Sequence, residues 1–267
     1  MYKTVNGMNI KYDEYGTNNK DHILFIHGLG SSSLVWRDIP EALSSKFHSI
    51  VIDLVGSGES DKPKENYTIS FFSKFVKDFI NEISISAGEK ISIIGHSLGG
   101  YIALDFALRN KEKIDKLILF DSSGLLSSPT PLLVEYHNAV KTADANLRRK
   151  KITKVLGDLY AHPSRLLPIV VDLFIYFIEK KGAVEAFESA YAYSTSNIID
   201  VKQMHKLSDL RCLILWGEKD KLIPISYAEQ FKKHLASAEL EIIKDAGHAP
   251  FVEKPAIVYQ ILIDFLK

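Results

Sequence analysis

The sequence predicts an α/β fold, in which a mostly parallel sheet is flanked by helices and an all-helical segment is inserted late in the chain. Three observations carry this prediction. Short apolar runs alternate with helical patterns up to Phe120, strand-like runs are absent from residues 125–206, and two such runs follow residue 207. A chain of 267 residues is long enough for one large domain with such an insertion. We therefore expect an α/β core of residues 1–124 and 207–267 and a helical cap of residues 125–206.

The predicted core strands are short runs rich in Ile, Val and Leu, each bounded by turn residues. Four lie at residues 22–27, 50–53, 91–95 and 117–120, and two more follow the cap at residues 212–216 and 240–243. Such runs are typical of parallel strands buried on both faces. An antiparallel edge is expected before them, because Asn6-Gly7 is a hairpin signal between residues 1–5 and 8–15.

Apolar residues at helical spacing predict helices between the strands. The clearest stripe consists of Phe71, Phe72, Phe75, Val76, Phe79, Ile80 and Ile83. A second helix is expected from Ser97 through Ala107, a capping box at Ser226 and Glu229 predicts another, and a last one follows Pro255. In the cap, the pattern predicts helices at residues 132–141, 147–160, 168–180 and 184–193.

Composition is that of a soluble globular protein and argues against some partners. Thirty-three basic residues balance thirty-three acidic ones, which argues against a dedicated nucleic-acid binder. The single cysteine, Cys212, has no partner for a disulfide within this chain and is interpreted as a buried small hydrophobe. The N-terminus lacks signal-peptide features, and the most apolar window, residues 166–178, is too short to span a bilayer. We expect a cytoplasmic protein without stable membrane insertion, and a homodimer stays open.

Residues 95–99 read Gly-His-Ser-Leu-Gly and fit the G-x-S-x-G pattern of a nucleophile elbow. The motif follows a predicted strand and opens a predicted helix. Glycines on both sides of Ser97 allow a sharp turn that exposes its Oγ, and the helix N-terminus supplies N–H groups. The alternative is a serine in an ordinary strand-to-helix turn. The context favours Ser97 as a catalytic nucleophile.

A serine hydroxyl needs a base to become a nucleophile, and His248 is the best of nine candidate histidines. It lies in a loop after the last predicted strand, which completes the chain order serine, acid, histidine. His96 adjoins the nucleophile but should point away from it. The other histidines border strands or lie in or near helical segments, and we interpret them as structural or surface residues: His22, His27, His48, His137, His162, His205 and His234.

The acid that orients this histidine should follow a strand between nucleophile and base. Asp220 does so, just after the run at residues 212–216. There it would hold the imidazole tautomer and stabilise the imidazolium. Asp121, at the end of an earlier predicted strand, stays open as a rival, and Glu218 is a weaker one. A solvated loop carboxylate is the alternative for all three.

A tetrahedral oxyanion needs N–H donors aimed at it. The N–H of Leu98 directly follows the nucleophile, and the N–H of Leu29 is expected in the glycine-flanked loop after the third strand. His27 either braces this loop or packs structurally. The G-x-G at residues 56–58 lacks the third glycine of a dinucleotide fingerprint and predicts a turn beside the site. No histidine, cysteine or carboxylate cluster has metal-site spacing.

Together these motifs resemble the α/β-hydrolase family over nearly the whole chain outside the cap. The matching segments follow the family's order and spacing: His27 to Gly30, Asp53 to Ser60, Gly95 to Gly100, Gly217 to Asp220 and Gly247 to Pro250. The resemblance implies an eight-stranded, mostly parallel sheet, an inserted cap and no cofactor.

Departures from subfamily patterns narrow the expected chemistry. Ser97 differs from the aspartate nucleophile of dehalogenase-like and epoxide-hydrolase-like members. Leu98 stands where proline iminopeptidase-like members carry tryptophan and cofactor-free haloperoxidases carry threonine. Ala249 stands where carbon–carbon hydrolases of the meta-cleavage type carry tryptophan. What remains resembles the carboxylesterases.

The sequence thus predicts a serine hydrolase that cleaves small-molecule carboxylic esters of apolar acyl or aryl groups through an acyl-enzyme. Aromatic residues of the cap would line an apolar lid or form the cap's own core: Tyr136, Tyr160, Phe174, Tyr176, Phe177, Phe187, Tyr191 and Tyr193. Alternatives with the same triad are a carbon–carbon bond hydrolase, a lactonase and an acyltransferase. A further alternative is a non-catalytic protein that binds a small ligand in the same pocket.

Overall fold

A computed structural model describes residues 1–83, 85 and 88–267, and within them eight strands form one sheet. The strands are β1 (Tyr2–Val5), β2 (Met8–Tyr15), β3 (His22–Ile26), β4 (His48–Ile52), β5 (Ile91–His96), β6 (Ile114–Phe120), β7 (Arg211–Gly217) and β8 (Glu239–Ile243). Their order across the sheet is β1-β2-β4-β3-β5-β6-β7-β8. β2 runs antiparallel to β1 and β4, and the other neighbours are parallel. The predicted eight-stranded, mostly parallel sheet is confirmed.

The antiparallel edge begins with a two-residue hairpin between β1 and β2. Asn6 and Gly7 have φ angles of 50° and 79°, and Val5 pairs with Met8 across the turn. Positive φ at both central positions is the hairpin geometry whose twist matches that of the strands. The Asn-Gly signal therefore predicted this turn correctly.

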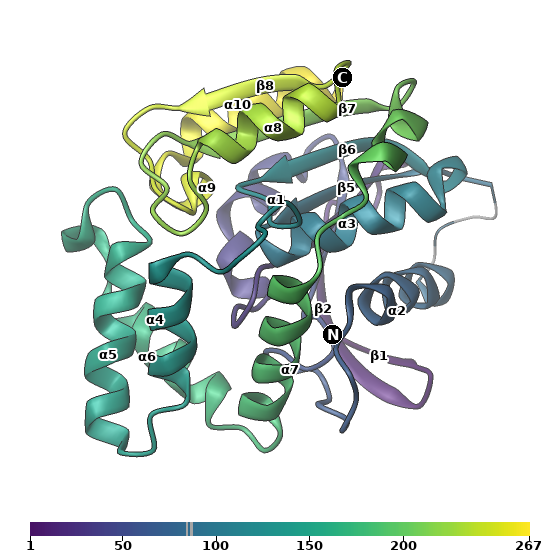
Figure 1. Ribbon diagram of the computed structural model, residues 1–267. Helices are drawn as coiled ribbons and strands as arrows, with labels where there is room; N and C mark the ends of the chain where they lie inside the picture. The colour runs from purple at the N-terminus through teal and green to yellow at the C-terminus, as the bar shows by residue number, and fades with distance from the viewer. Residues whose placement is uncertain (84, 86–87) are drawn as a thin grey trace.

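Helices cover both faces of the sheet (Figure 1). One face carries α2 (Ile69–Glu82), α3 (Leu98–Arg109) and α8 (Ser226–His234), and the other carries α1 (Asp38–Leu43), α9 (Pro250–Glu253) and α10 (Pro255–Leu266). Leu24 of β3 packs in the apolar cluster of the first face and Phe25 in that of the second. Successive side chains of a strand point to opposite faces, so a strand covered on both sides must be apolar throughout.

Helix α2 shows how capping and burial stabilise one of these elements. Its N-cap residue, Thr68, accepts a hydrogen bond from the Phe71 N–H at 3.0 Å. Phe72, Phe75 and Phe79 are buried on its apolar stripe, and each contributes about 1.5–3 kcal/mol by leaving water. The helix is therefore held to the sheet by the stripe that predicted it.

Four helices are inserted between β6 and β7. They are α4 (Pro131–Val140), α5 (Ala145–Asp158), α6 (Pro168–Ile178) and α7 (Ala183–Ser196), and the same insertion contains the short 3₁₀ segments η3 (Pro163–Arg165) and η4 (Val201–Leu207). Two other 3₁₀ segments lie in the core, η1 (Ser33–Trp36) after β3 and η2 (Lys111–Lys113) before β6. Figure 1 shows α4, α5 and α6 grouped beside the sheet, and α7 packs against α2. Their side chains and the loops after β3, β5 and β8 line one common cavity. The inserted helices therefore cover the carboxyl ends of the parallel strands.

The helix predicted to begin with a capping box at Ser226 is present, but it has no capping box. Helix α8 begins at Ser226 itself, and Ile225 before it already has helical angles (φ −52°, ψ −25°) with no side-chain cap. The N–H of Tyr227 donates to the carbonyl of Pro224 at 2.9 Å. Because a turn runs directly into the helix, Ser226 does not occupy the extended N-cap position that a capping box requires.

The other predicted elements differ from the structure only at their ends. The largest shift among the strands is at β6, which begins at Ile114 rather than Leu117. Cys212 is buried in β7, and burial raises the pKa of its thiol to about 12. Within the described ranges, no helix combines the length and apolarity needed to cross a bilayer.

Candidate active site

Ser97 stands at a sharp turn between β5 and α3, in a conformation that serine rarely adopts. Its backbone angles are φ 54° and ψ −118°. A Cβ on Gly95 would lie 2.3 Å from the Gly99 carbonyl oxygen, and one on Gly99 would lie 2.3 Å from that of Ile26. The turn thus requires both glycines of the motif, and a non-glycine residue at positive φ costs about 1–3 kcal/mol. Such strain is typical of functional positions.

The structure brings His248 and Asp220 together, as predicted. His248 Nδ1 lies 2.7 Å from Asp220 Oδ2, and both side chains are buried. The other oxygen, Asp220 Oδ1, accepts hydrogen bonds from the N–H groups of Leu222 at 2.7 Å and Ile223 at 2.9 Å. Backbone donors fix the carboxylate, which in turn fixes the imidazole with its proton on Nδ1. Nε2 is therefore left as the basic nitrogen.

The backbone of His248 is held from two sides. Its N–H donates to the carbonyl of Leu159 at 2.7 Å, just after α5, and its own carbonyl accepts from His96 Nε2 at 2.7 Å. Burial, and then the neighbouring His248, hold the pKa of His96 well below its ordinary range. As predicted, His96 is no base for Ser97. It positions the loop of His248 instead, a role that could not be predicted from the sequence.

Ser97 and His248 line the same cavity, which has a volume of about 410 Å³. This size lies within the range of small-molecule sites, about 300–1,000 Å³. Most of the lining is apolar and comes from both the core and the inserted helices: Leu126, Leu133, Tyr136, Leu156, Leu159, Tyr160, Leu167, Val170, Leu173, Phe174, Phe177, Leu222, Ile223 and Val252 among others. Four of the eight predicted cap aromatics thus line the cavity.

The remaining cap aromatics lie elsewhere. Phe187 borders a smaller pocket, Tyr176 is mostly exposed, and Tyr191 stacks on His137 with ring centroids 4.1 Å apart. Tyr193 is half-buried. The cap aromatics therefore serve both as cavity wall and as packing within the inserted helices.

The loop of Leu29, one expected oxyanion donor, packs directly against Ser97. A Cβ on Gly28 would lie 3.0 Å from Ser97 Cβ, and both Leu29 and Leu98 line the cavity. Among the loop hydrogen bonds of the described residues, neither the Leu29 N–H nor the Leu98 N–H has a backbone acceptor. Both donors are thus available to an oxyanion.

His27 braces this loop through hydrogen bonds on both ring nitrogens. Nδ1 donates to the carbonyl of Gly28 at 2.8 Å, and Nε2 accepts from the N–H of Leu54 at 3.0 Å. An imidazole that accepts at Nε2 is neutral. Consistently, burial lowers the pKa of His27.

A hydroxyl from the inserted helices also reaches the loop of Leu29 that was expected to hold an oxyanion. Tyr136 Oη on α4 donates to the carbonyl of Leu29 at 3.1 Å. Gly30 has φ 67°, and a Cβ there would lie 2.3 Å from that hydroxyl. The contact was not predicted, because nothing in the sequence sets Tyr136 apart from the other aromatics of the segment.

The two rival acids occupy different positions. Glu218 is exposed and accepts from the Asp245 N–H at 3.1 Å, away from the histidine. Asp121 is fully buried, and its Oδ1 accepts from the Gly217 N–H at 2.8 Å. Ligand atoms of Asp121, Asp220 and His248 lie within 4.8 Å of one another. The hydrogen bond to His248 is made by Asp220, so the structure favours it over Asp121.

This trio is the only group in the described residues that gathers three metal-ligand side chains. Most of its ligand atoms already have hydrogen-bond partners, since the His248 Nδ1–H donates to Asp220 Oδ2 and backbone N–H groups donate to Oδ1 of each carboxylate. The arrangement therefore fits a hydrogen-bonded His248–Asp220 pair with Asp121 beside it better than a metal centre.

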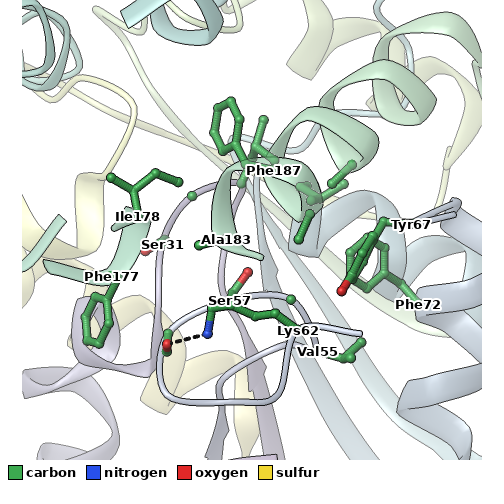
Figure 2. Close-up of a pocket in the computed structure, with 17 residues that line it drawn as sticks. Ser31, Val55, Ser57, Lys62, Tyr67, Phe72, Phe177, Ile178, Ala183 and Phe187 are labelled. Atoms are coloured by element: carbon green, nitrogen blue, oxygen red, sulfur yellow. Dashed lines mark hydrogen bonds between the residues drawn. The ribbon is translucent and has the colours of Figure 1, made fainter. Parts of the chain in front are cut away.

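The G-x-G segment forms a turn, as predicted. Asp53 locks it, with Oδ1 accepting from the Ser33 N–H at 2.5 Å and Oδ2 from the Glu59 N–H at 2.7 Å. Figure 2 shows this turn under α7, where it borders a second, smaller pocket. Lys62 Nζ donates to the carbonyls of Gly58 and Ser60, both at 2.8 Å. The lysine thus stiffens the turn.

Comparison with known proteins agrees with this fold. A family model described as alpha/beta hydrolase fold matches residues 21–255. The uncharacterized protein Mb2734 of Mycobacterium bovis is 27% identical over 295 residues, covering 100% of this chain and 80% of that protein. Monoacylglycerol lipase abhd6-B of Xenopus laevis is 22% identical over 289 residues, covering 97% of this chain and 82% of the lipase.

A solved structure has the same fold across nearly its whole length. It is the meta-cleavage product hydrolase CumD of Pseudomonas fluorescens IP01, complexed with acetates, which superposes with a TM-score of 0.88 at 22% identity. The match covers 99% of this chain and 96% of that one. Since the family model spans most of the sequence and the sheet has the expected order, this chain belongs to the α/β-hydrolase fold family.

Proposed function

We propose that the protein is a serine hydrolase that cleaves carboxylic esters of apolar acyl or aryl groups through an acyl-enzyme. The observation that carries the proposal is a hydrogen-bonded His248–Asp220 pair opening on the same apolar cavity as the strained Ser97. The related frog protein's name, monoacylglycerol lipase, supports an ester substrate.

The geometry supports the following sequence of steps. Ser97 Oγ attacks the ester carbonyl while His248 Nε2 accepts its proton, and Asp220 stabilises the resulting imidazolium. The N–H groups of Leu29 and Leu98 hold the oxyanion, and each such donor contributes about 10²–10³ in rate. His248 then protonates the leaving alcohol, and a water molecule repeats the steps on the acyl-enzyme.

The lining of the cavity supports the choice of an apolar substrate. Leucine, valine and aromatic side chains dominate, and the charged residues that border it are Arg37 and Asp38. We propose that residues 125–206 act as the lid of this cavity, because α4, α5 and α6 supply one of its walls.

The second candidate function is carbon–carbon bond hydrolysis with the same triad. The likeness to the meta-cleavage product hydrolase supports it at the level of fold. Against it stands Ala249 at the position after the catalytic histidine, where the sequence departs from that subfamily.

Hydrolysis of p-nitrophenyl esters from acetate to palmitate tests the proposal. Wild type should turn over part of the series, and Ser97→Ala should lose about 10⁴–10⁶ in kcat. Ser194→Ala is the matched control, since Ser194 is a buried serine of the same cavity whose hydroxyl donates to the Tyr191 carbonyl. Ester turnover that survives in Ser97→Ala contradicts the proposal. If esters fail but a dienone substrate is cleaved, the second candidate replaces the first.

A further inference from the structure

The structure places one buried carboxylate beside the triad that the mechanism above does not use. Asp121 follows β6, is fully buried and has a left-handed φ of 42°. A non-glycine residue keeps that conformation only where its surroundings enforce it. Here the conformation goes with a side chain that reaches β7, where Oδ1 accepts from the Gly217 N–H at 2.8 Å.

The hydrogen bonds indicate which of the two neighbouring carboxylates is better placed to hold a negative charge. Buried carboxylates as close as Asp121 and Asp220 share one negative charge. Asp220 accepts three N–H donors, from Leu222, Ile223 and His248 Nδ1. Asp121 accepts the single donor described above. Both side chains are buried, but Asp220 accepts three hydrogen bonds and Asp121 accepts one. Because N–H donors stabilise a carboxylate, we assign the negative charge to Asp220 and the proton to Asp121.

A proton on Asp121 also accounts for its second oxygen. Among the described residues, Asp121 Oδ2 is buried without a hydrogen-bond partner. As the O–H of a neutral carboxyl it becomes a donor, and the Asp220 carboxylate lies within 4.8 Å. The pKa of Asp121 is raised well above its ordinary range, chiefly by burial and next by Asp220, and Glu253 acts in the same direction.

We propose that Asp121 is a positioning residue that stays protonated through the reaction and donates its Oδ2–H to the carboxylate of Asp220. The inference rests on the proposed catalytic roles of Ser97 and His248. The donated hydrogen bond spreads the charge of Asp220 and limits how strongly that charge stabilises the His248 imidazolium. The imidazolium then remains acidic enough to protonate the leaving group.

The test measures how fast a fluorophosphonate labels Ser97 as a function of pH, in wild type, Asp121→Asn and Asp121→Leu. The acidic limb of this profile reports protonation of His248. Asparagine can accept from the Gly217 N–H and still donate to Asp220, so its limb should lie within about half a unit of wild type. Leucine removes the donor, which leaves Asp220 more strongly anionic, so its limb should move to higher pH by about one unit.

The opposite charge assignment gives a different pattern. An ionised Asp121 would itself stabilise the imidazolium, and both substitutions would then move the limb to lower pH by on the order of two units. That result overturns the inference, as does a leucine profile that coincides with the asparagine profile. If the leucine variant does not fold, Asp121→Ala, which also lacks the donor, takes its place, and its limb should likewise move to higher pH by about one unit.

Labelling needs no ester substrate, so the two proposals fail separately. If the labelling profiles have their acidic limbs at the expected pH but no ester is hydrolysed, the proposed substrate class is rejected and the role of Asp121 is retained. If esters are hydrolysed but the acidic limbs of Asp121→Asn and Asp121→Leu both lie at lower pH, the role of Asp121 is rejected and the substrate class is retained. A purely structural role would lower the melting temperature of both variants and leave the limb where it is in wild type.

Discussion

At the residue scale, two strained residues stand at the carboxyl ends of neighbouring strands. Ser97 and Asp121 have φ angles of 54° and 42°. The first could be predicted, because the glycines at positions 95 and 99 mark a turn that only small neighbours permit. The second could not be assigned a protonation state from sequence, because that depends on its distance from Asp220. Sequence order left Asp121 open as an acid, and the hydrogen bond of His248 favours Asp220.

The Asp220–His248 bond gives a prediction at this scale. Asp220→Asn keeps an oxygen for the Leu222 and Ile223 N–H groups but presents an N–H₂ group to His248. Nδ1 must then accept, Nε2 carries the proton, and the imidazole is no longer a base. We expect kcat to fall about 10⁴-fold with little change in the melting temperature.

Glu218→Gln is the matched control, since Glu218 is a carboxylate of the same loop that is exposed. It should retain turnover. Equal losses in the two variants, or an Asp220→Asn enzyme with near-normal kcat, would show that His248 is oriented by another group.

At the element scale, the inserted helices are joined to the parts of the core that carry the chemistry. Tyr136 of α4 holds the Leu29 carbonyl, and the carbonyl of Leu159 holds the His248 N–H. The existence of these helices followed from apolar periodicity, but their contacts to the site did not. Periodicity shows which face of a helix is buried, and it does not show which hydroxyl or carbonyl of that face meets the core. The same reasoning explains the error at Ser226, where the preceding turn already has helical angles.

Tyr136→Phe tests the link between the inserted helices and the oxyanion loop. The change removes one hydroxyl and keeps the ring, which packs against Phe174 and Phe187. A hydrogen bond is worth about 0.5–1.5 kcal/mol, so kcat should fall about 2- to 10-fold while KM changes little. Steady-state kinetics beside Tyr191→Phe, a tyrosine of α7 that stacks on His137, provides the comparison. An unchanged kcat, or a change in KM alone, would show that the Tyr136 hydroxyl does not support the loop of Leu29 during catalysis.

At the scale of the whole molecule, the sheet order and its two covered faces were predictable because each strand is apolar throughout. The interior also encloses polar groups whose state depends on the fold. His27 and His96 are fully buried or nearly so, and burial lowers the pKa of each. Both are therefore neutral when the protein is folded and regain a pKa near 6.5 when it unfolds.

The lowered pKa values of His27 and His96 predict how the free energy of unfolding depends on pH. Below about pH 6.5 the unfolded chain binds more protons than the folded one, so the free energy of unfolding falls as pH decreases, by about 1.4 kcal/mol per pH unit for each histidine. Above that pH their contribution is complete and constant. The raised pKa of Asp121 has the opposite effect, because it makes the free energy of unfolding fall as pH rises. This contribution cancels when wild type is compared with a variant that differs only at a histidine.

Urea unfolding of wild type and His96→Phe between pH 5 and pH 7.5 checks this account. The variant loses the hydrogen bond to the His248 carbonyl and should be less stable at pH 7.5 by about 1 kcal/mol. It also loses one titrating group, so the difference should shrink or reverse toward pH 5. Parallel curves would mean that His96 binds its proton equally well in both states.

The proposed function requires that Ser97 is a nucleophile activated by His248 and Asp220. The most direct measurement is fluorophosphonate labelling followed by mass spectrometry of the digested protein, for wild type, Ser97→Ala and Asp220→Asn. We expect one phosphonyl group on the peptide that contains Ser97, none in Ser97→Ala and strongly slowed labelling in Asp220→Asn. If wild type is not labelled, or if the label lies on another residue, Ser97 is not the nucleophile.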